Sequence, residues 1–349
     1  MRFAANVLFT WGHEMMIASD DTSDAAYELF TRTMQFGAFS PVFTSWGNKD
    51  EPNNLWQMQP KVIWTLLFCP VLKFVVKYLN ATRDVLVFRA KLLPYIYTMY
   101  KIASDTGLII SRPMYYSHPK APESYDYTFA REYMFGDSIL VAPVFVPMDQ
   151  NQTAPVTVWF PPIAECSSEC PRWFALDNPL ESYVAGSVST LHYPLSRIPA
   201  FAPSGAILTL LPTADAVPFG AAGRPTYPSM ELWIFPATFN SETWIYEDDG
   251  FSSKPDYVNT TISVTRGSLT RVSVKSQSFG LKYPVVNRPY SVRLIGARVN
   301  ENTEVMLSGN KLPKFSNCSS LQAPGWCFDS VSLMVQTLPT TNFSVVILN

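Results

Sequence analysis

The sequence has few of the residues that build metal centres. Its 349 residues include three histidines and five cysteines. No cysteine pair has histidine or cysteine companions at zinc-ligand spacing, so we expect no metal ion and no other cofactor. Charge is also scarce, since 15% of the residues are charged and the formal net charge is −2. That balance gives no reason to expect nucleic acid or an anionic membrane surface as a partner.

A clean membrane-spanning stretch is missing as well. Residues 62–79 form the longest apolar run, but Pro70, Lys73 and Lys77 interrupt it, and a span needs about 20 apolar residues. We interpret this run as a buried or surface-packed helix. The first residues, M-R-F-A-A-N-V-L-F-T-W, begin with a positive charge, but Asn6 interrupts the apolar stretch and no cleavage site follows. The sequence therefore shows no signal peptide.

The cysteines that are present include two close pairs. Cys166 and Cys170 flank S-S-E, and Cys318 and Cys327 flank a turn at Gly325, so either pair could close a small loop in an oxidising compartment. Asparagine sequons favour the same compartment, and they occur at Asn80, Asn151, Asn259, Asn317 and Asn342. We therefore expect the lumen of the secretory pathway (the endoplasmic reticulum or a lysosome-like compartment) or the cell exterior.

One amphipathic helix separates two kinds of architecture. An apolar stripe, with residues alternately three and four apart, consists of Val85, Phe88, Leu92, Tyr95, Met99 and Ile102. This spacing predicts one helix of about five turns. Pro94 lies inside it and is expected to bend it, and Gly107 is expected to cap it in a left-handed conformation. The apolar residues 108–110 then predict a short buried strand.

Two strand-to-helix units are predicted before this helix. A strand over residues 4–10 ends on Trp11-Gly12-His13-Glu14, a helix spans residues 25–36, and a strand over residues 40–44 ends on Ser45-Trp46-Gly47. Polar or aromatic residues thus follow the C-terminal end of each strand. In a (β/α)8 barrel, ligands and catalytic groups lie at that end. The sequence before the β-rich part is long enough for only the last quarter of such a barrel.

After Pro113 the helical period gives way to short β-type runs separated by proline, glycine and asparagine. Aromatic residues make up 14% of the chain, which suits both sugar-contacting surfaces and large β-rich cores. Asp137, in F-G-D-S, is expected to hold a turn by bonding backbone donors. The run Glu247-Asp248-Asp249-Gly250 lacks the alternating oxygen spacing of a calcium loop, so we interpret it as a β-hairpin turn.

Six sequence blocks follow one another along the chain. They are E-L-F-T-R-T-M-Q-F-G-A-F-S-P-V-F (28–43), R-A-K-L-L-P-Y-I-Y-T (89–98), T-G-L-I-I-S-R-P-M-Y-Y (106–116), Y-M-F-G-D-S-I-L-V-A-P-V (133–144), P-L-S-R-I-P-A-F (194–201) and Y-E-D-D-G (246–250). Their order and spacing resemble the C-terminal half of glycoside hydrolase family 31, the α-glucosidase family. The resemblance covers roughly residues 5–258.

The resemblance implies an α/β plus all-β fold: the last two βα units of a (β/α)8 barrel followed by two C-terminal β-sandwich domains. We place the partial barrel, with strands seven and eight, at residues 1–108. The first sandwich is expected at residues 109–217 and a linker at 218–228. The second sandwich is expected at residues 229–349.

The family's chemistry needs two carboxylates about 5 to 5.5 Å apart, one acting as nucleophile and one as acid/base. In the family both are aspartates on earlier barrel strands, in W-x-D-M-N-E-type and G-D-N-type motifs. Neither motif occurs in these 349 residues. We therefore expect no catalytic residue in this chain and no activity of the chain alone. An α-glucoside is an expected partner only where the missing barrel portion, or a partner chain, completes the barrel.

The sugar-pocket residues that are expected to remain are altered. Where the family reads G-H-D-I-G-G-F, this chain reads G-H-E-M-M-I-A, so Glu14 replaces a hydroxyl-binding aspartate and reaches one methylene further. Trp46 replaces a hydroxyl-binding histidine; it can stack on a sugar ring but donates one hydrogen bond. We take His13, Glu14 and Trp46 as candidate substrate-binding residues. Ordinary solvation of Glu14, packing of Trp46 and a structural role for His13 are the alternatives.

Three functions remain open on the sequence alone. The chain is the C-terminal portion of an α-glucosidase-type hydrolase, a non-catalytic relative whose sandwiches bind carbohydrate or protein, or an interaction module without a ligand. The altered pocket favours the second. A cut barrel leaves unpaired strand edges and exposed apolar helix faces, which favours the first because the missing barrel would cover them.

Overall fold

The structure, a computed structural model, describes residues 12–15, 24–45, 72–163, 171–213, 227–250, 252, 255–280 and 283–348, with the backbone alone for residues 12–15, 44–45 and 72–76. The chain divides into two compact units. Unit 1 consists of Met1–Arg89, Gly107–Trp159 and Val188–Ala200, and unit 2 of Ala90–Thr106, Phe160–Ser187 and Phe201–Asn349. Within the described ranges, no helix is long and apolar enough to cross a membrane.

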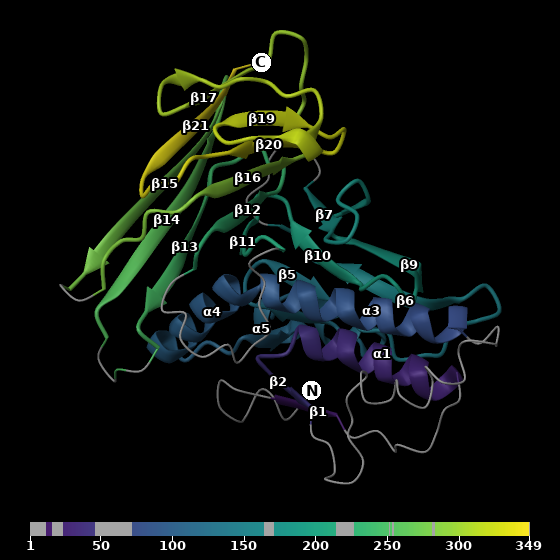
Figure 1. The fold of residues 1–349 in the computed structure, drawn as a ribbon. Helices are drawn as coiled ribbons and strands as arrows, with labels where there is room; N and C mark the ends of the chain where they lie inside the picture. Colours follow the sequence, from purple (N-terminus) through teal and green to yellow (C-terminus); the bar gives the residue numbers. More distant parts are fainter. Residues whose placement is uncertain are drawn as a thin grey trace. The chain divides into compact units, whose positions relative to one another are not determined.

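Unit 1 begins with a strand, a helix and a second strand. These are β1 (Gly12–Met15), α1 (Asp24–Ala38) and β2 (Val42–Ser45), and β2 pairs with β1 in parallel (Figure 1). Parallel strands joined through a helix form the repeating unit of a (β/α)8 barrel, so this part of the predicted fold class is confirmed. The strand predicted over residues 4–10 lies outside the described residues.

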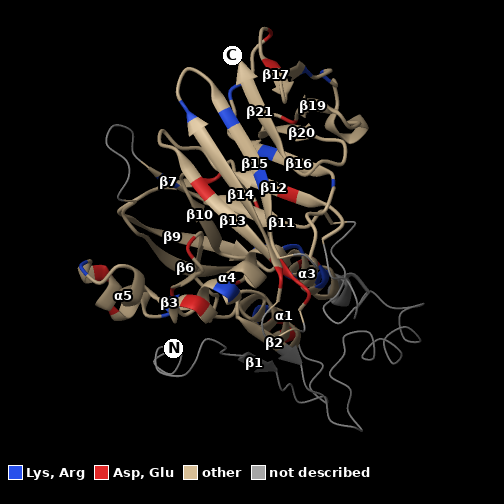
Figure 2. Ribbon diagram, turned by 90° about the vertical axis from the view of Figure 1, so that its left-hand side faces the viewer, with Lys and Arg blue, Asp and Glu red and all other residues tan. Residues whose placement is uncertain are grey.

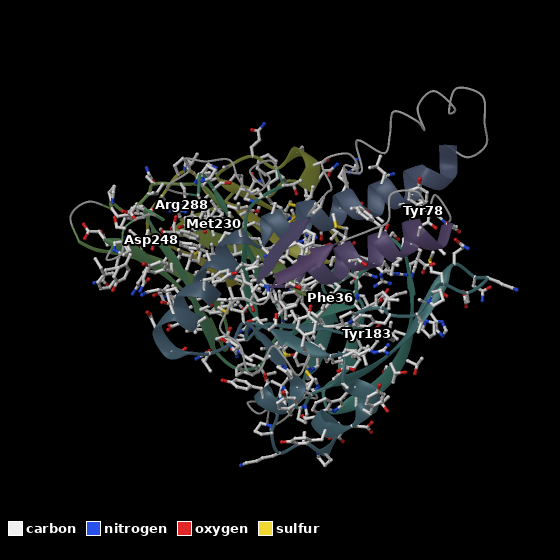
Figure 3. All side chains as sticks on the ribbon, turned by 90° about the horizontal axis from the view of Figure 1, so that it is seen from below. Phe36, Tyr78, Tyr183, Met230, Asp248 and Arg288 are labelled. Atoms are coloured by element: carbon white, nitrogen blue, oxygen red, sulfur yellow. A yellow bond between two sulfur atoms is a disulfide. The ribbon has the colours of Figure 1, made fainter. Side chains whose placement is uncertain are left out.

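Two helices of unit 1 pack through a mixed apolar and polar seam. Phe30 and Met34 of α1 are buried, as their spacing predicts. The Tyr78 hydroxyl of α3 (Leu72–Lys91), labelled in Figure 3, donates a hydrogen bond to Asp24 at the first turn of α1. Thr31 and Thr82 lie within hydrogen-bond distance of each other, at 3.4 Å, so polar contacts fix the pairing that apolar burial drives.

The long helix differs from its prediction in two ways. It begins at Leu72 rather than at Asp84, and it is two helices, α3 and α4 (Leu93–Thr106). The break at Leu92 stands next to Pro94, which has no N–H to donate to the preceding turn. Gly107 has φ +80°, which confirms the left-handed cap. The strand predicted over residues 108–110 is wrong, because β3 begins at Ser111.

The remainder of unit 1 consists of short elements. Strands β3 (Ser111–Pro113), β4 (Tyr133–Phe135) and β5 (Ile139–Val141) pair in that order, all antiparallel. Between β3 and β4 lie α5 (Met114–Ser117) and two 3-10 turns, η1 (Pro122–Tyr125) and η2 (Tyr127–Phe129). Strand β6 (Thr153–Phe160) pairs with β9 (Ser187–Pro194).

Asp137 lies in the turn between β4 and β5, but its partner differs from the prediction. Its carboxylate binds the Arg112 guanidinium of β3 instead of the backbone donors of its own turn. The preceding Gly136 has φ +65° and makes the turn possible. Asp137 therefore joins two strands of unit 1.

Three short strands of unit 2 surround an aromatic cluster. β10 (Ala200–Pro203), β7 (Arg172–Ala175) and β8 (Ser182–Val184) pair in that order. The Phe160 ring stacks on Tyr183 with centroids 4.6 Å apart and meets Phe201 edge-on at 4.9 Å. Such rings contribute most of the buried apolar area where strands are this short.

The larger part of unit 2 is a sandwich of two sheets (Figure 1). The first sheet has the order β11 (Ile207–Leu210), β12 (Met230–Ile234), β16 (Tyr290–Ile295), β20 (Ser332–Gln336) and β19 (Gly325–Phe328). The second has the order β13 (Ser241–Asp248), β14 (Tyr257–Arg266), β15 (Thr270–Phe279), β21 (Phe343–Leu348), β17 (Glu304–Leu307) and β18 (Asn310–Lys311).

Alternation along these strands builds the core between the two sheets. In β14 every second residue is buried, from Val258 to Val264, as expected for a strand with one side facing the core and the other facing solvent. Leu232, Val292 and Val335 of the first sheet join the same core cluster. Residues 207–210, which we placed before the linker at 218–228, pair with β12 as β11 and so belong to this sandwich.

Candidate functional site

The parallel strands β1 and β2 carry the residues that the sequence singled out. His13 stands opposite Phe43 and Glu14 opposite Thr44 in the pairing register. Both therefore lie within β1, not just after its end as predicted. Trp46 follows the last residue of β2 and lies outside the described residues. The structure gives the backbone of His13 and Glu14, so it places both residues in β1 without describing their side chains.

A buried arginine fixes the segment that leads into β2. Arg89 of α3 donates through Nη1 to the Ala38 carbonyl at 3.0 Å and through Nη2 to the Pro41 carbonyl at 2.8 Å. The Tyr133 hydroxyl donates to the Phe39 carbonyl at 3.0 Å. Arg89 is 6% exposed. A planar guanidinium can reach both carbonyls at once, which the single ammonium of a lysine cannot do with the same geometry.

The close approach of α1 and β2 depends on a glycine. A Cβ placed on Gly37 would stand 2.3 Å from the Phe43 ring, far inside contact distance. Because Phe43 is a residue of β2 itself, the missing side chain lets the strand pass directly under the end of the helix. The F-G-A-F sequence of the first block therefore has a packing reason.

Two polar residues of α1 bind the P-L-S-R-I-P segment. The Arg32 guanidinium donates to the carbonyls of Tyr193 at 3.0 Å and Pro194 at 3.3 Å. Gln35 donates to the Leu195 carbonyl at 2.6 Å. Burial lowers the pKa of Arg32 to about 10, so it stays charged at neutral pH. Two of the six sequence blocks, residues 28–43 and 194–201, are thus in contact in unit 1. These contacts are hydrogen bonds that stabilise the fold.

Glu132 is a buried carboxyl group that the sequence analysis did not single out. Its Oε1 accepts a hydrogen bond from the Trp159 amide at 2.8 Å, and Oε2 has no partner among the described residues. Burial raises the pKa of Glu132 to about 8. Groups of this kind often mark active sites. Here the surroundings are apolar, with the Trp159 ring packed against Phe129 and His118, so the geometry favours a structural role.

The carboxylates of the acidic run Glu247-Asp248-Asp249-Gly250 bind other groups of the same chain. Glu247 receives two hydrogen bonds from Nη2 of Arg288, at 2.9 and 2.8 Å, and both side chains are 3% exposed. Burial raises the pKa of Glu247, and Arg288 opposes that effect. Asp248 accepts from the Tyr97 hydroxyl at 2.5 Å and from the Gly250 amide at 2.9 Å. Figure 3 labels Asp248 and Arg288 at this end of the sandwich.

The prediction of a hairpin turn is confirmed, since β13 and β14 are antiparallel neighbours and the run leads from one toward the other: Glu247 and Asp248 end β13, and Asp249 and Gly250 follow it. The connection is longer than a two-residue turn because β14 begins at Tyr257. No group of three or more histidine, cysteine or acidic side chains is placed to hold a metal ion in the part of the chain that the structure describes.

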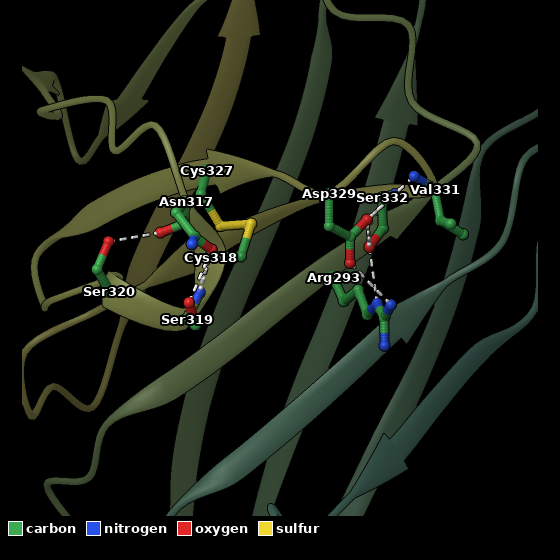
Figure 4. The surroundings of a disulfide bond; sticks show 9 residues. All are labelled: Arg293, Asn317, Cys318, Ser319, Ser320, Cys327, Asp329, Val331 and Ser332. Carbon is green, nitrogen blue, oxygen red and sulfur yellow. Dashed lines mark hydrogen bonds and ion pairs between the residues drawn. A yellow bond between two sulfur atoms is a disulfide. The ribbon is translucent and has the colours of Figure 1, made fainter.

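One of the two cysteine pairs is joined in unit 2. Cys318 and Cys327 form a disulfide with a Cα–Cα distance of 5.3 Å (Figure 4). Next to it, the Asn317 side chain accepts from the Ser319 amide at 2.9 Å and caps the 3-10 turn η3 (Cys318–Ser320). Cys166 and Cys170 lie outside the described residues.

The five sequons occupy different surroundings. Asn80 and Asn151 are exposed, and Asn317 and Asn342 are exposed but already bond a neighbouring amide through their side-chain oxygens. Asn259 is half-buried in the middle of β14. Sequence gives no sign of these differences, because the sequon itself is the same in each place.

Comparison with family models matches two adjoining parts of the chain. Residues 9–99 match the model described as "Glycosyl hydrolases family 31 TIM-barrel domain". Residues 107–208 match the model described as "Glycosyl hydrolase family 31 C-terminal domain". The first match contains β1, α1 and β2, and the second contains β3 to β10.

Curated relatives are similar over most of this chain. An isomaltosyltransferase of Sporosarcina globispora is 27% identical over 319 residues, which cover 87% of this chain and 25% of that protein. Alpha-glucosidase 2 of Bacillus thermoamyloliquefaciens is 25% identical over 295 residues, or 81% of this chain and 31% of that protein. The chain thus spans between a quarter and a third of the length of these relatives.

Solved structures share the fold. A dextranase of Flavobacterium johnsoniae complexed with glucose superimposes with a TM-score of 0.71 at 22% identity, over 94% of this chain and 38% of that one. A cycloalternan-forming enzyme of Listeria monocytogenes in complex with a pentasaccharide substrate superimposes with a TM-score of 0.70 at 20% identity, over 95% and 28%.

Proposed function

Since the chain belongs to glycosyl hydrolase family 31, we propose that it supplies the end of the (β/α)8 barrel and the sheet-rich domains of an α-glucosidase-type hydrolase. The observation that carries this is the parallel pair β1 and β2, which lies inside the match to the family's barrel domain. Two parallel strands are an isolated fragment of a sheet unless further strands pair with their free edges. The function that suits them is to complete a barrel whose other strands lie elsewhere.

In this role the chain contributes substrate contacts and support. His13, Glu14 and Trp46 would face the sugar from the carboxyl ends of the last two barrel strands. The buried Arg89 and Gly37 would hold β2 in position for them. The attacking and protonating carboxylates come from the missing portion of the barrel. The substrate class is an α-linked glucoside or a related oligosaccharide, in keeping with the names of the relatives.

The first test is an assay of the 349-residue chain alone. We expect no release of 4-nitrophenol from 4-nitrophenyl α-glucoside and none of glucose from isomaltotriose above the buffer rate, because neither catalytic motif occurs in it. Release that tracks the purified chain would contradict the proposed division of labour.

The second test asks where the rest of the barrel is. The coding sequence upstream of Met1 is read in all frames for a W-x-D-M-N-E-like and a G-D-N-like motif, and the extended protein is expressed. Hydrolysis by the extended protein, lost when the aspartate of the first motif is changed to alanine, would support the proposal. If no such motif exists upstream and no partner chain confers activity, the chain is a non-catalytic relative.

We also propose that the protein resides in the lumen of the secretory pathway or outside the cell. The bond between Cys318 and Cys327 supports this, because disulfides persist in oxidising compartments. The exposed sequons at Asn80 and Asn151 support it as well. Fractionation of the natural source, with a glycosidase-sensitive mobility shift as readout, tests the compartment.

A further inference from the structure

The second sheet of the sandwich has an outward face with an unusual mixture of side chains. Residues of β13, β14 and β15 line a hollow of about 440 Å³ there, among them Glu242, Asn259, Thr261, Lys275, Gln277 and Phe279. A hollow of this size is within the range of about 300 to 1,000 Å³ that small ligands occupy. Figure 2 shows charged residues of both signs on these strands.

The strand register arranges polar groups into neighbouring rows. Asn259 stands directly opposite Gln277, and Thr261 directly opposite Lys275. Directly opposed side chains have Cβ atoms about 5 Å apart, and successive rows on one face follow at about 7 Å. The face therefore presents two amides, a hydroxyl and an ammonium within the reach of one ligand.

An aromatic ring closes one end of these rows. Phe279 is 38% exposed, and its ring stacks on Tyr257 with centroids 4.8 Å apart. Tyr257 in turn packs on Tyr246 at 5.4 Å, and Lys101 lies over both tyrosine rings. Phe279 is thus held by a supported stack and stays partly exposed to solvent.

Asn259 has a polar atom that the protein leaves unsatisfied. Its Oδ1 is buried and has no hydrogen-bond partner among the described residues. A buried acceptor without a donor costs about 1 to 3 kcal/mol, so a rotation of the Asn259 side chain that lets a ligand donate to it would be favourable. The hollow contains Glu242 and Lys275, one charge of each sign. A balanced lining favours an uncharged ligand over phosphate or nucleic acid.

From these observations we propose that the outer face of β13, β14 and β15 binds a neutral oligosaccharide. Sugars present an apolar C–H face, which a supported aromatic ring can cover, and hydroxyl groups, which amides and an ammonium bind. The site needs no part of the barrel, so it goes beyond the proposed hydrolytic role and does not depend on it. The oligosaccharide is either free in solution or attached to the chain itself at the Asn259 sequon.

The first arm of the test uses the full chain produced in a bacterial host that adds no N-glycans. Isomaltotriose and maltotriose are titrated, and saturation-transfer NMR with calorimetry measures binding. We expect saturable binding of at least one sugar, weakened about tenfold or more by Phe279→Ala and by Gln277→Ala. Arg271→Ala, an exposed change on the same strand β15 outside the hollow, is the matched control and is expected to bind like the parent chain.

Thermal unfolding and circular dichroism of each variant separate loss of binding from loss of folding. A folded Phe279→Ala variant that binds as well as the parent would overturn the proposed site. A variant that fails to fold is replaced by Lys275→Ala, which changes an exposed side chain of the same face.

The second arm identifies the source of the sugar. The chain is produced in a eukaryotic host, and mass spectrometry determines the occupancy of Asn259. If Asn259 is glycosylated and this protein no longer binds the added trisaccharides, the attached glycan occupies the face. If Asn259 is unmodified and the trisaccharides bind, the ligand is free. If neither sugar binds the bacterial protein and Asn259 is unmodified, the proposal is wrong.

Discussion

Single buried polar residues decide much of the geometry in unit 1. Arg89 and Tyr133 bind the carbonyls of Ala38, Phe39 and Pro41 just before β2, and Arg32 binds the start of the P-L-S-R-I-P segment. The sequence could show that Arg89 falls within an amphipathic helix. It could not show the two carbonyls that it binds, because these lie about 50 residues earlier and backbone groups carry no sequence signature.

The Arg89 contacts predict a large loss of stability on substitution. Arg89→Ala removes two charge-assisted hydrogen bonds and leaves two carbonyls without their donor, which is expected to cost roughly 3 kcal/mol. Denaturant unfolding of the whole chain measures it. Arg83→Ala in the same helix is the control, because Arg83 is 66% exposed and pairs only with the equally exposed Asp84; it is expected to stay within about 0.5 kcal/mol. Equal effects of the two changes would contradict the stabilising role of the two Arg89 hydrogen bonds.

Glu132 predicts a dependence of stability on pH. Burial raises its pKa from 4.5 to about 8, so the folded state holds the proton more tightly than the unfolded state. The contribution of Glu132 to the free energy of unfolding is therefore largest below pH 4.5 and falls as the pH rises toward 8, by roughly 5 kcal/mol in all at about 1.4 kcal/mol per pH unit.

The variant Glu132→Gln is expected to remove this slope. Its side-chain oxygen can still accept from the Trp159 amide, and it has no proton to lose. Melting temperatures of the variant and the parent are compared between pH 4.5 and 8.5, with the exposed Glu301→Gln as control. A slope that survives in Glu132→Gln would show that another group titrates.

At the scale of elements, regular burial is what the sequence predicts best. Helix α1, which spans Asp24–Ala38, differs from its predicted bounds of 25–36 by two residues or fewer at each end. Strands β7, β8 and β10 have three or four residues and no clear alternation, so their pattern does not distinguish them from turns. Helix α3 was misjudged at its start because two apolar runs, predicted separately, join into one helix.

The Thr98 hydroxyl is one of the links between helix α4 and strand β13. Thr98 donates to the Pro94 carbonyl at 2.8 Å and accepts from the buried Tyr246 amide at 3.1 Å. Thr98→Val keeps the shape and removes the acceptor, so it is expected to cost about 1 to 3 kcal/mol. Thr33→Val in α1 is the matched control, since the Thr33 hydroxyl donates only to the Leu29 carbonyl on an exposed surface. Hydrogen exchange of the Tyr246 amide is the direct readout, and unchanged protection would refute the link.

At the scale of the whole molecule, the sequence was enough to predict the fold class and the family. It was not enough to predict the proposed binding face on β13, β14 and β15. Six blocks in series carry enough information to identify the architecture, and the comparisons agree. The outer face of β13, β14 and β15 has no such block. It depends on which residues of three strands become neighbours, and register is a property of the folded sheet.

The disulfide provides a prediction for the intact chain. Cys318 and Cys327 are nine residues apart, and closing a loop of that size is expected to stabilise the folded state by about 2.5 kcal/mol. The double change Cys318→Ser with Cys327→Ser is therefore expected to lower the melting temperature, measured without reductant. Reductant is expected to have the same effect on the parent chain and none on the double variant. A parent chain indifferent to reductant would mean that the bond is not formed in solution.

Each unit is built from segments that alternate along the chain with segments of the other unit, and this order has a consequence during synthesis. Unit 2 includes Ala90–Thr106 and Phe160–Ser187, but most of it follows Phe201. The ribosome therefore releases Tyr95, Ile96 and Met99 of α4, buried in the finished protein, well before the strands β11 and β13 that pack with α4 exist. A nascent chain with exposed apolar residues of this kind is a substrate for chaperones. We expect its yield in a cell to depend on chaperone capacity more than that of a protein of equal size whose domains follow one another in sequence.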